Sequence, residues 1–407
     1  MHRELVDRRR WISDRRFLHA LNYCMLLPGP EAQQLAIYAG WLLHRVVGGL
    51  AAGICFVLPG VALIWGISCV YVLWGNVPWI DAVFYGLKPA VIAIVAAAVI
   101  RLGRKALKDW IRWGIAAAAF IGIFFLGIPF PAIVIGSGVF GWLLWRWRPA
   151  LFGGAESTSH TTDLYAAAPD GYVIDDSAVS EIGRPTMQRT LRTATLWTAV
   201  WLAPVVACWA VLGSGHVLTQ EGFFFSKASL VTFGGAYAVL PYVAQQAVET
   251  HGWLTATQMV DGLGLAETTP GPLVLVLQFV GFLGGWNEPG AASPLLMATL
   301  AAGLTSWVIF MPGFLFIFAG APFAESSRDN RHINVALSAV TAAVVGVILN
   351  LAVWFSWHVV YPTPGHPDYF SILAAIAFFV LLQRFKWDVL WVIGTGAVIG
   401  VLYRLLV

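Results

Sequence analysis

Long apolar segments alternate with short polar ones along most of the chain. An α-helix needs about 17 to 25 residues to cross a bilayer, and many of the apolar runs reach that length. The pattern predicts helical segments at 19–43, 46–74, 83–101, 113–127 and 130–146, and then at 193–212, 222–246, 258–283, 293–320, 333–359, 369–383 and 387–407. We therefore expect an all-α polytopic membrane protein.

One polar stretch divides these segments into two sets. Residues Ala155–Thr190 are rich in Ser, Thr, Asp and Gly, which is typical of a polar linker. We expect a first transmembrane repeat at 1–150, a polar cytoplasmic linker at 151–192, and a connecting helix with a second transmembrane repeat at 193–407.

Composition agrees with a membrane location. Of the 407 residues, 59% are hydrophobic and 11% are charged, whereas soluble domains average about 25% charged residues. The Lys and Arg residues lie mainly in loops, so the net charge of +3 does not indicate a nucleic-acid partner. Residues 1–18 are basic and interrupted by acids, and so do not resemble a cleavable signal.

The distribution of Lys and Arg predicts how the segments are oriented. The basic loops are Arg101–Arg112, Arg146–Arg148 continuing to Arg184–Arg192, Arg328–Arg331, and Arg384–Lys386. The loops between them lack Lys and Arg, so all the basic loops fit on the cytoplasmic side. Segment 46–74 then runs outward and segment 293–320 runs inward. The two repeats are therefore expected to be inverted, with the C-terminus outside.

The start of the chain does not fit this alternation. The Arg-rich residues 3–16 and the pair His44-Arg45 both favour the cytoplasm, although segment 19–43 lies between them. Either this segment dips into the membrane and returns, or a partner span is missing. The second half has an extra segment, 222–246, before the equivalent position, so we expect the first repeat to be short at its N-terminus.

Four short motifs occur twice in the same order, which indicates a duplicated unit. The pairs are Trp11-Ile12-Ser13 with Trp253-Leu254-Thr255, Pro28-Gly29-Pro30 with Pro270-Gly271-Pro272, Val57-Leu58-Pro59-Gly60 with Phe310-Met311-Pro312-Gly313, and Ile135-Gly136-Ser137-Gly138 with Ile393-Gly394-Thr395-Gly396. Matched helix-breaking motifs in two hydrophobic halves are a sequence indication of a transporter's substrate site.

Each Pro-Gly-Pro motif predicts a broken helix whose start faces the substrate. Pro30 and Pro272 suit the first helical position, where a missing N–H costs nothing. Gly29 and Gly271 allow an oxyanion to approach the backbone, and Pro28 and Pro270 complete the motifs. A kinked helix packed on its neighbours is the alternative, which the duplication disfavours.

The amino-acid sequences of three segments resemble those of a known family. Lys227–Tyr237 (KASLVTFGGAY), Ala266–Leu273 (AETTPGPL) and Cys24–Leu35 (CMLLPGPEAQQL) resemble the chromate ion transporter family, in its long-chain, two-domain form. The resemblance covers nearly the whole chain. It implies export of chromate across a bacterial inner membrane, with sulfate as a structural analogue, driven by an ion gradient. The first half departs from the family by lacking a Phe-Gly-Gly helix.

Other residues near the breaks are further candidates for anion binding. Phe233, Gly234 and Gly235 predict another break, with close helix packing as the alternative. Thr268 and Thr269 could donate hydroxyl groups to the anion or bond back to helix carbonyls. Lys227 could attract the anion or extend to the membrane interface.

Two carboxylates flank the Pro-Gly-Pro motifs. Glu31 follows the first and Glu267 precedes the second, so either could carry a proton as the coupling ion, or act as a helix cap. We expect no metal site and no cofactor, because the four cysteines lie in apolar runs without His or Asp neighbours.

These observations predict a secondary active transporter that exports a small tetrahedral oxyanion, most simply chromate, by alternating access. The expected partners are chromate or sulfate, the lipid bilayer, protons and a second copy of the chain in a homodimer. A transporter of another small anion, or an anion channel, is the alternative. A membrane-embedded enzyme fits less well, because no predicted span carries a His/Asp cluster or a Ser–His arrangement.

Overall fold

The described part of the molecule is helical throughout. The computed structural model describes residues 1–75, 77–147, 173, 186–233, 235–269, 271–326, 331–362 and 365–406, and these contain helices but no strands. Seven helices in these ranges are long and apolar enough to cross a membrane. The chain is thus an all-α multi-pass membrane protein, as its hydrophobic pattern predicts.

The first half contains a short π-helix and five α-helices. They are η1 (Arg3–Arg8), α1 (Asp14–Leu26), α2 (Glu31–Trp74), α3 (Pro78–Ala106), α4 (Trp110–Phe124) and α5 (Phe130–Trp147). The long α2 is interrupted at His44 and Arg45, where the backbone leaves the helical region. Gly40 lies against Gly48 across this turn, so the chain folds back on itself there.

The second half begins with the connecting helix and has two more breaks. Its elements are α6 (Met187–Leu212), α7 (Val217–Val231), α8 (Ala236–Ala244), η5 (Gln245–Thr250), α9 (Ala256–Thr268), η6 (Leu273–Leu275), α10 (Val276–Asn287), α11 (Pro294–Ser326), α12 (Arg331–Val360), α13 (Tyr369–Gln383) and α14 (Val389–Leu406). The expected segments 19–43, 222–246 and 258–283 are therefore each two helices separated by a break, because their Gly and Pro residues do not continue a helix.

Element lengths confirm the repeat. The helices α1 and α9 have 13 residues each, α4 and α13 have 15 each, and α5 and α14 have 18 each. The two six-residue π-helices also match: η1 begins at Arg3 and η5 begins at Gln245, which is 242 residues later. The Trp and Pro-Gly-Pro motifs show the same offset.

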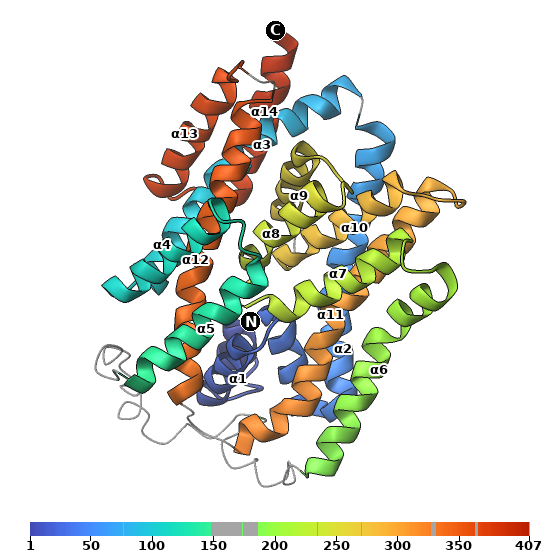
Figure 1. Ribbon diagram of the computed structural model, residues 1–407, viewed down its shortest axis with the longest axis vertical. Helices are drawn as coiled ribbons and strands as arrows, with labels where there is room; N and C mark the ends of the chain where they lie inside the picture. The colour runs from blue at the N-terminus through green and yellow to red at the C-terminus, as the bar shows by residue number, and fades with distance from the viewer. Residues whose placement is uncertain are drawn as a thin grey trace.

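The two repeats are inverted. In Figure 1, α2 rises toward the top of the molecule while α11 descends, and α1 lies in the lower half while its mate α9 lies in the upper half. The end of α5 is at the bottom and the C-terminus is at the top. The inversion expected from loop charges is therefore present in the fold.

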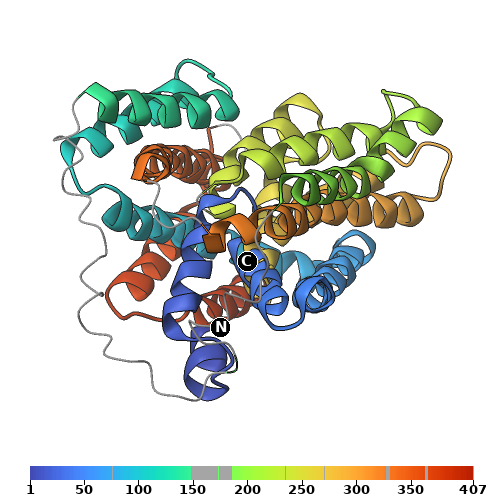
Figure 2. The same ribbon diagram turned by 90° about the horizontal axis from the view of Figure 1, so that it is seen from below.

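The halves are joined by an exchange of helices. The helix α3 of the first half packs against α13 and α14 of the second, and α12 packs against α4 and α5 of the first. Seen from below, the teal α4–α5 hairpin covers the orange α12 on one side of the molecule (Figure 2). Glycines permit these contacts, since a Cβ on Gly86 would lie 2.0 Å from the Gly396 carbonyl oxygen, and one on Gly346 would lie 2.0 Å from that of Ala116.

Candidate functional site

The two Pro-Gly-Pro breaks follow helices with the same start and the same end. Ser13 caps α1 by accepting a hydrogen bond from the Arg16 N–H, and Thr255 caps α9 by accepting one from the Gln258 N–H. Both helices then end in an extended residue, Leu27 in the first half and Thr269 in the second. Local sequence thus builds the same approach to each break.

The glycines and prolines of the two motifs set the direction of the chain after the break. Gly29 has a φ of +114°, in a region that favours glycine, and Gly271 has a φ of +157°, close to extended backbone. Pro30 and Pro272 are the N-cap residues of α2 and η6. The motifs predict both prolines at the first helical position rather than at the N-cap. Their extended ψ angles (98° and 133°) make them caps instead.

Helices that begin at the breaks lack side-chain caps. The N-caps of α2 (Pro30), η6 (Pro272) and α8 (Gly235) make no side-chain hydrogen bond, whereas Asp109 and Asp368 cap α4 and α13. The first N–H groups of a helix have no partner within it and lie at the positive end of its dipole. These helix starts are therefore suited to binding an anion.

Direct contacts bring the three breaks together. The Gly29 N–H donates to the Thr232 carbonyl (2.8 Å), immediately before Phe233. The Tyr237 hydroxyl, in the first turn of α8, donates to Glu267. These contacts connect the Phe-Gly-Gly break to both Pro-Gly-Pro breaks. Gly234 and Pro270 lie outside the described residues.

Glutamine side chains link each break to the other half. Gln33 donates to the Phe310 carbonyl on α11 (3.1 Å), and Gln278 donates to the Val61 carbonyl on α2 (2.9 Å). Both acceptors lie within two residues of a helix proline, Pro312 or Pro59. The links are reciprocal, as expected for two related halves. Gln34 stays within its own half and donates to the Pro28 carbonyl (2.7 Å).

Positive charge reaches the site from the end of α3. The Arg101 guanidinium acts electrostatically on Glu267, and the Lys105 ammonium acts on Glu31. The two cations are exposed, and the two acids are partly buried. Lys227, in contrast, lies on an exposed face of α7 with Phe223 and Leu230, so the structure does not bring it to the breaks.

The threonine hydroxyls before the second break are already engaged. Thr268 donates to the Leu265 carbonyl (2.7 Å) and Thr269 donates to the Ala266 carbonyl (3.0 Å). This is the back-bonding arrangement named as the alternative to anion binding. Phe233 is partly buried and packs against the hydrophobic core.

Two buried acids in the second half were missed by the sequence analysis. Asp261 on α9 accepts a hydrogen bond from Tyr71 of α2 (2.9 Å) and lies 3.9 Å from the ammonium group of Lys88 on α3. Glu221 on α7 is fully buried. A single acid within an apolar segment was the signal available in the sequence for both. Within the described ranges, no cluster of three His, Cys, Asp or Glu residues could hold a metal ion.

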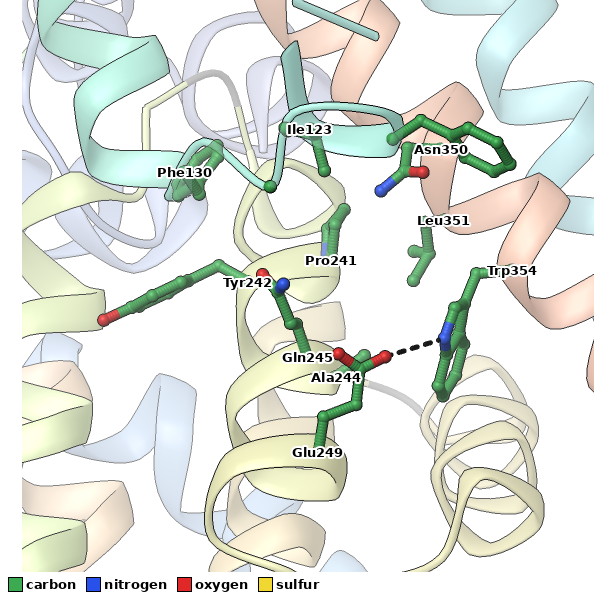
Figure 3. Close-up of a pocket in the computed structure, with 12 residues that line it drawn as sticks. Ile123, Phe130, Pro241, Tyr242, Ala244, Gln245, Glu249, Asn350, Leu351 and Trp354 are labelled. Atoms are coloured by element: carbon green, nitrogen blue, oxygen red, sulfur yellow. Dashed lines mark hydrogen bonds between the residues drawn. The ribbon is translucent and has the colours of Figure 1, made fainter. Parts of the chain in front are cut away.

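A separate cavity of about 300 Å³ lies between the α4–α5 turn, α8 with η5, and α12. Figure 3 shows its polar side chains, Gln245, Glu249 and Asn350, with Glu249 accepting a hydrogen bond from Trp354 (3.2 Å). None of the residues of the breaks lines this cavity. The breaks are the better candidate site, because helices with uncapped starts begin there and the cations Arg101 and Lys105 act on them.

Comparison with known proteins places the chain among transporters. The family model described as "Chromate transporter" matches residues 1–142 and 219–401. A chromate transport protein of Cupriavidus metallidurans is 29% identical over 100% of this chain and 88% of its own length. One of Pseudomonas aeruginosa is 30% identical over 98% of this chain and 86% of its own length. A probable chromate transport protein of Synechococcus elongatus is 27% identical over 87% of this chain and 77% of its own length. No solved structure matches the chain.

Proposed function

This chain belongs to the chromate transporter family, and we propose that it is a secondary active transporter that exports chromate by alternating access between its two inverted halves. The proposed location is a bacterial cytoplasmic membrane. Inverted repeats with broken helices at their interface are typical of such transporters. The substrate class rests on the names of the relatives, which are chromate transport proteins.

The observation that carries the proposal is that direct contacts link three breaks, each followed by a helix without a side-chain cap. Chromate and sulfate are tetrahedral dianions, and each has four oxygens that can accept hydrogen bonds. The starts of α2, η6 and α8 offer N–H groups and positive dipole ends without a full charge that would trap the anion. Arg101 and Lys105 add positive potential that attracts the anion toward the breaks.

The proposed anion site consists of backbone around the breaks. It comprises Gly29 to Glu31, Gly271 to Leu273 and Gly235, together with Pro28 and Phe233 of the same motifs. The Gly29 N–H would take part only after leaving the Thr232 carbonyl. The motif residues Gly234 and Pro270 belong to the proposed site by sequence alone. Thr268 and Thr269 would take part only after leaving their carbonyl partners. Lys227 faces outward in this conformation, so its role in the proposal is reduced to the membrane interface.

Coupling to protons is the simplest way to drive export of a dianion. Glu31 and Glu267 stand beside the two breaks, and Glu267 shares its hydrogen bond with Tyr237. A carboxyl group there can change protonation when its break opens or closes. The site lies within one chain, so the predicted homodimer would support stability rather than complete the site.

Radiolabelled flux in proteoliposomes tests the proposal. We expect saturable chromate flux that sulfate inhibits and that an imposed pH gradient accelerates. A channel would instead show flux that never accumulates the anion against its gradient. No chromate or sulfate flux above that of protein-free liposomes would overturn the proposal.

A further inference from the structure

A fully buried carboxyl group lies between three helices of the second half, away from the breaks. Glu221, in the second turn of α7, is 0% exposed. Its Oε2 atom accepts a hydrogen bond from the Thr305 hydroxyl on α11 (3.5 Å). The other wall is α10, which presents Gly281 and Gly284 to the carboxyl group.

Glycines create the space that this carboxyl group occupies. A Cβ on Gly284 would lie 2.2 Å from Glu221 Oε1. A Cβ on Gly281 would lie 2.2 Å from the Thr305 hydroxyl and 3.3 Å from Glu221 Oε2. No side chain larger than hydrogen fits at either position without displacing a polar group, so α10 is shaped around the Glu221–Thr305 pair.

A buried indole borders the same space. The Trp253 ring lies 3.2 Å from the Cβ position of Gly284. Its Nε1 atom and Glu221 Oε1 are both buried, and neither has a hydrogen-bond partner among the described residues. The surroundings of Glu221 therefore include a buried donor and a buried acceptor without partners, which is unusual for a static core.

The charges around Glu221 do not neutralise it. In the described residues it forms no ion pair, and the one other acid that acts on it is Glu288 at the end of α10. His251 stacks on Trp253 with ring centroids 4.3 Å apart, and it forms no ion pair with Glu221 in the described residues. A carboxylate left buried without a positive partner costs several kcal/mol. A cation such as Ca²⁺ needs about six to eight oxygen ligands, whereas this pocket offers one carboxyl and one hydroxyl group.

We propose that Glu221 is a proton-binding site that gradient-driven anion transport requires in addition to Glu31 and Glu267, an inference that rests on the proposed secondary transport. The link to the anion site is α7 itself. This helix carries Glu221 near its start and leads directly to Thr232, whose carbonyl accepts the hydrogen bond of Gly29. Loss of the proton leaves a buried charge, which favours movement of α7 toward water at the exposed loop 213–215. Movement of α7 shifts Thr232, and this weakens the hydrogen bond between its carbonyl and Gly29 at the first Pro-Gly-Pro break.

The substitution Glu221→Gln tests this role, because glutamine keeps the shape of the side chain and cannot release a proton. Chromate and sulfate flux are measured in proteoliposomes with and without a pH gradient. We expect the variant to retain downhill flux and to lose at least a tenfold stimulation by the gradient. Glu249→Gln, which alters an acid in the separate cavity, should respond to the gradient like the wild type.

The outcomes separate the two proposals. Normal gradient stimulation in Glu221→Gln overturns the inference and leaves transport standing. Absence of anion flux in the wild-type protein overturns both. A second measurement needs no variant: a hydrophobic carbodiimide modifies protonated carboxyl groups in apolar surroundings, and mass spectrometry identifies the site. We expect Glu221 to be modified more at low pH, and no modification at any pH would contradict the inference.

Discussion

The two Pro-Gly-Pro breaks share one backbone path but differ in how they are covered. In the first half, Gly29 and Pro30 are buried, and the Gly29 N–H is bonded to Thr232. In the second half, Gly271 is exposed. The same local structure is therefore present in a covered and an open form within one molecule.

This difference shows which parts of the repeat are essential to its shape. The residues before the breaks are Leu26-Leu27 in one half and Thr268-Thr269 in the other, yet both helices end with the same extended geometry. The break is thus encoded by Gly and Pro, and the side chains around it are free to specialise.

The largest effect is expected when valine replaces the glycine of either Pro-Gly-Pro motif. Gly271→Val should abolish chromate flux while leaving membrane insertion intact, because its new side chain occupies the open approach and meets mainly the movable end of Leu275. Gly29→Val should reduce the yield of folded protein as well, since φ at Gly29 is +114° and Gln34 lies close. Flux and size-exclusion chromatography in detergent measure the two effects. Normal flux in correctly inserted Gly271→Val protein would show that the helix-start site is wrong.

The second-largest effect is a loss of stability. It is expected when a bulky side chain separates α3 or α12 from the helices of the opposite half that it packs against. Gly346→Leu and Gly86→Leu should each cost about 3 kcal/mol or more, because each new side chain would meet backbone of the opposite half. Gly114→Leu on α4 is the matched control, since nothing lies within 4 Å of its Cβ position. Thermal unfolding in detergent compares the three. Equal melting temperatures would mean that the halves are not packed through these glycines.

An intermediate effect is expected at the ion pair between Asp261 and Lys88. Asp261→Asn should cost about 1 to 3 kcal/mol, because the partly buried Lys88 loses its carboxylate partner while the amide oxygen can still accept the hydrogen bond of Tyr71. Adding Lys88→Met should recover part of this loss. The equivalent positions in the other repeat are His19 and Thr341, so Thr341→Val should have little effect. Strictly additive losses in the double variant would show that Lys88 and Asp261 do not interact.

The smallest change in stability is expected at the two turns that precede the capped helices α1 and α9. Arg10 (φ +51°) stands where the other repeat has Gly252 (φ +67°). Arg10→Gly should stabilise the protein by about 1 kcal/mol, and Gly252→Ala should destabilise it by a similar amount, because a Cβ is disfavoured in this region. Melting temperatures would report both changes. Shifts of the same sign would contradict the equivalence of the two turns.

The sequence by itself determined the features that depend on local chemistry. Proline lacks an N–H and glycine tolerates positive φ, so the helix breaks at 28–30 and 270–272 could be located without a structure. Spanning segments follow from the length of apolar runs, and inversion follows from the side on which Lys and Arg accumulate. Repeated motifs revealed the two halves because their spacing is preserved.

Only the tertiary structure decided which side chains meet. Sequence could not show that Lys227 lies on an exposed face of α7 while Glu221, six residues earlier, is fully buried, because the choice of buried face depends on which helices pack there. The pairing of Asp261 with Tyr71 and Lys88 joins residues up to 190 positions apart. The exchange of helices between halves likewise depends on long-range packing through glycines, which leaves no local pattern in the chain.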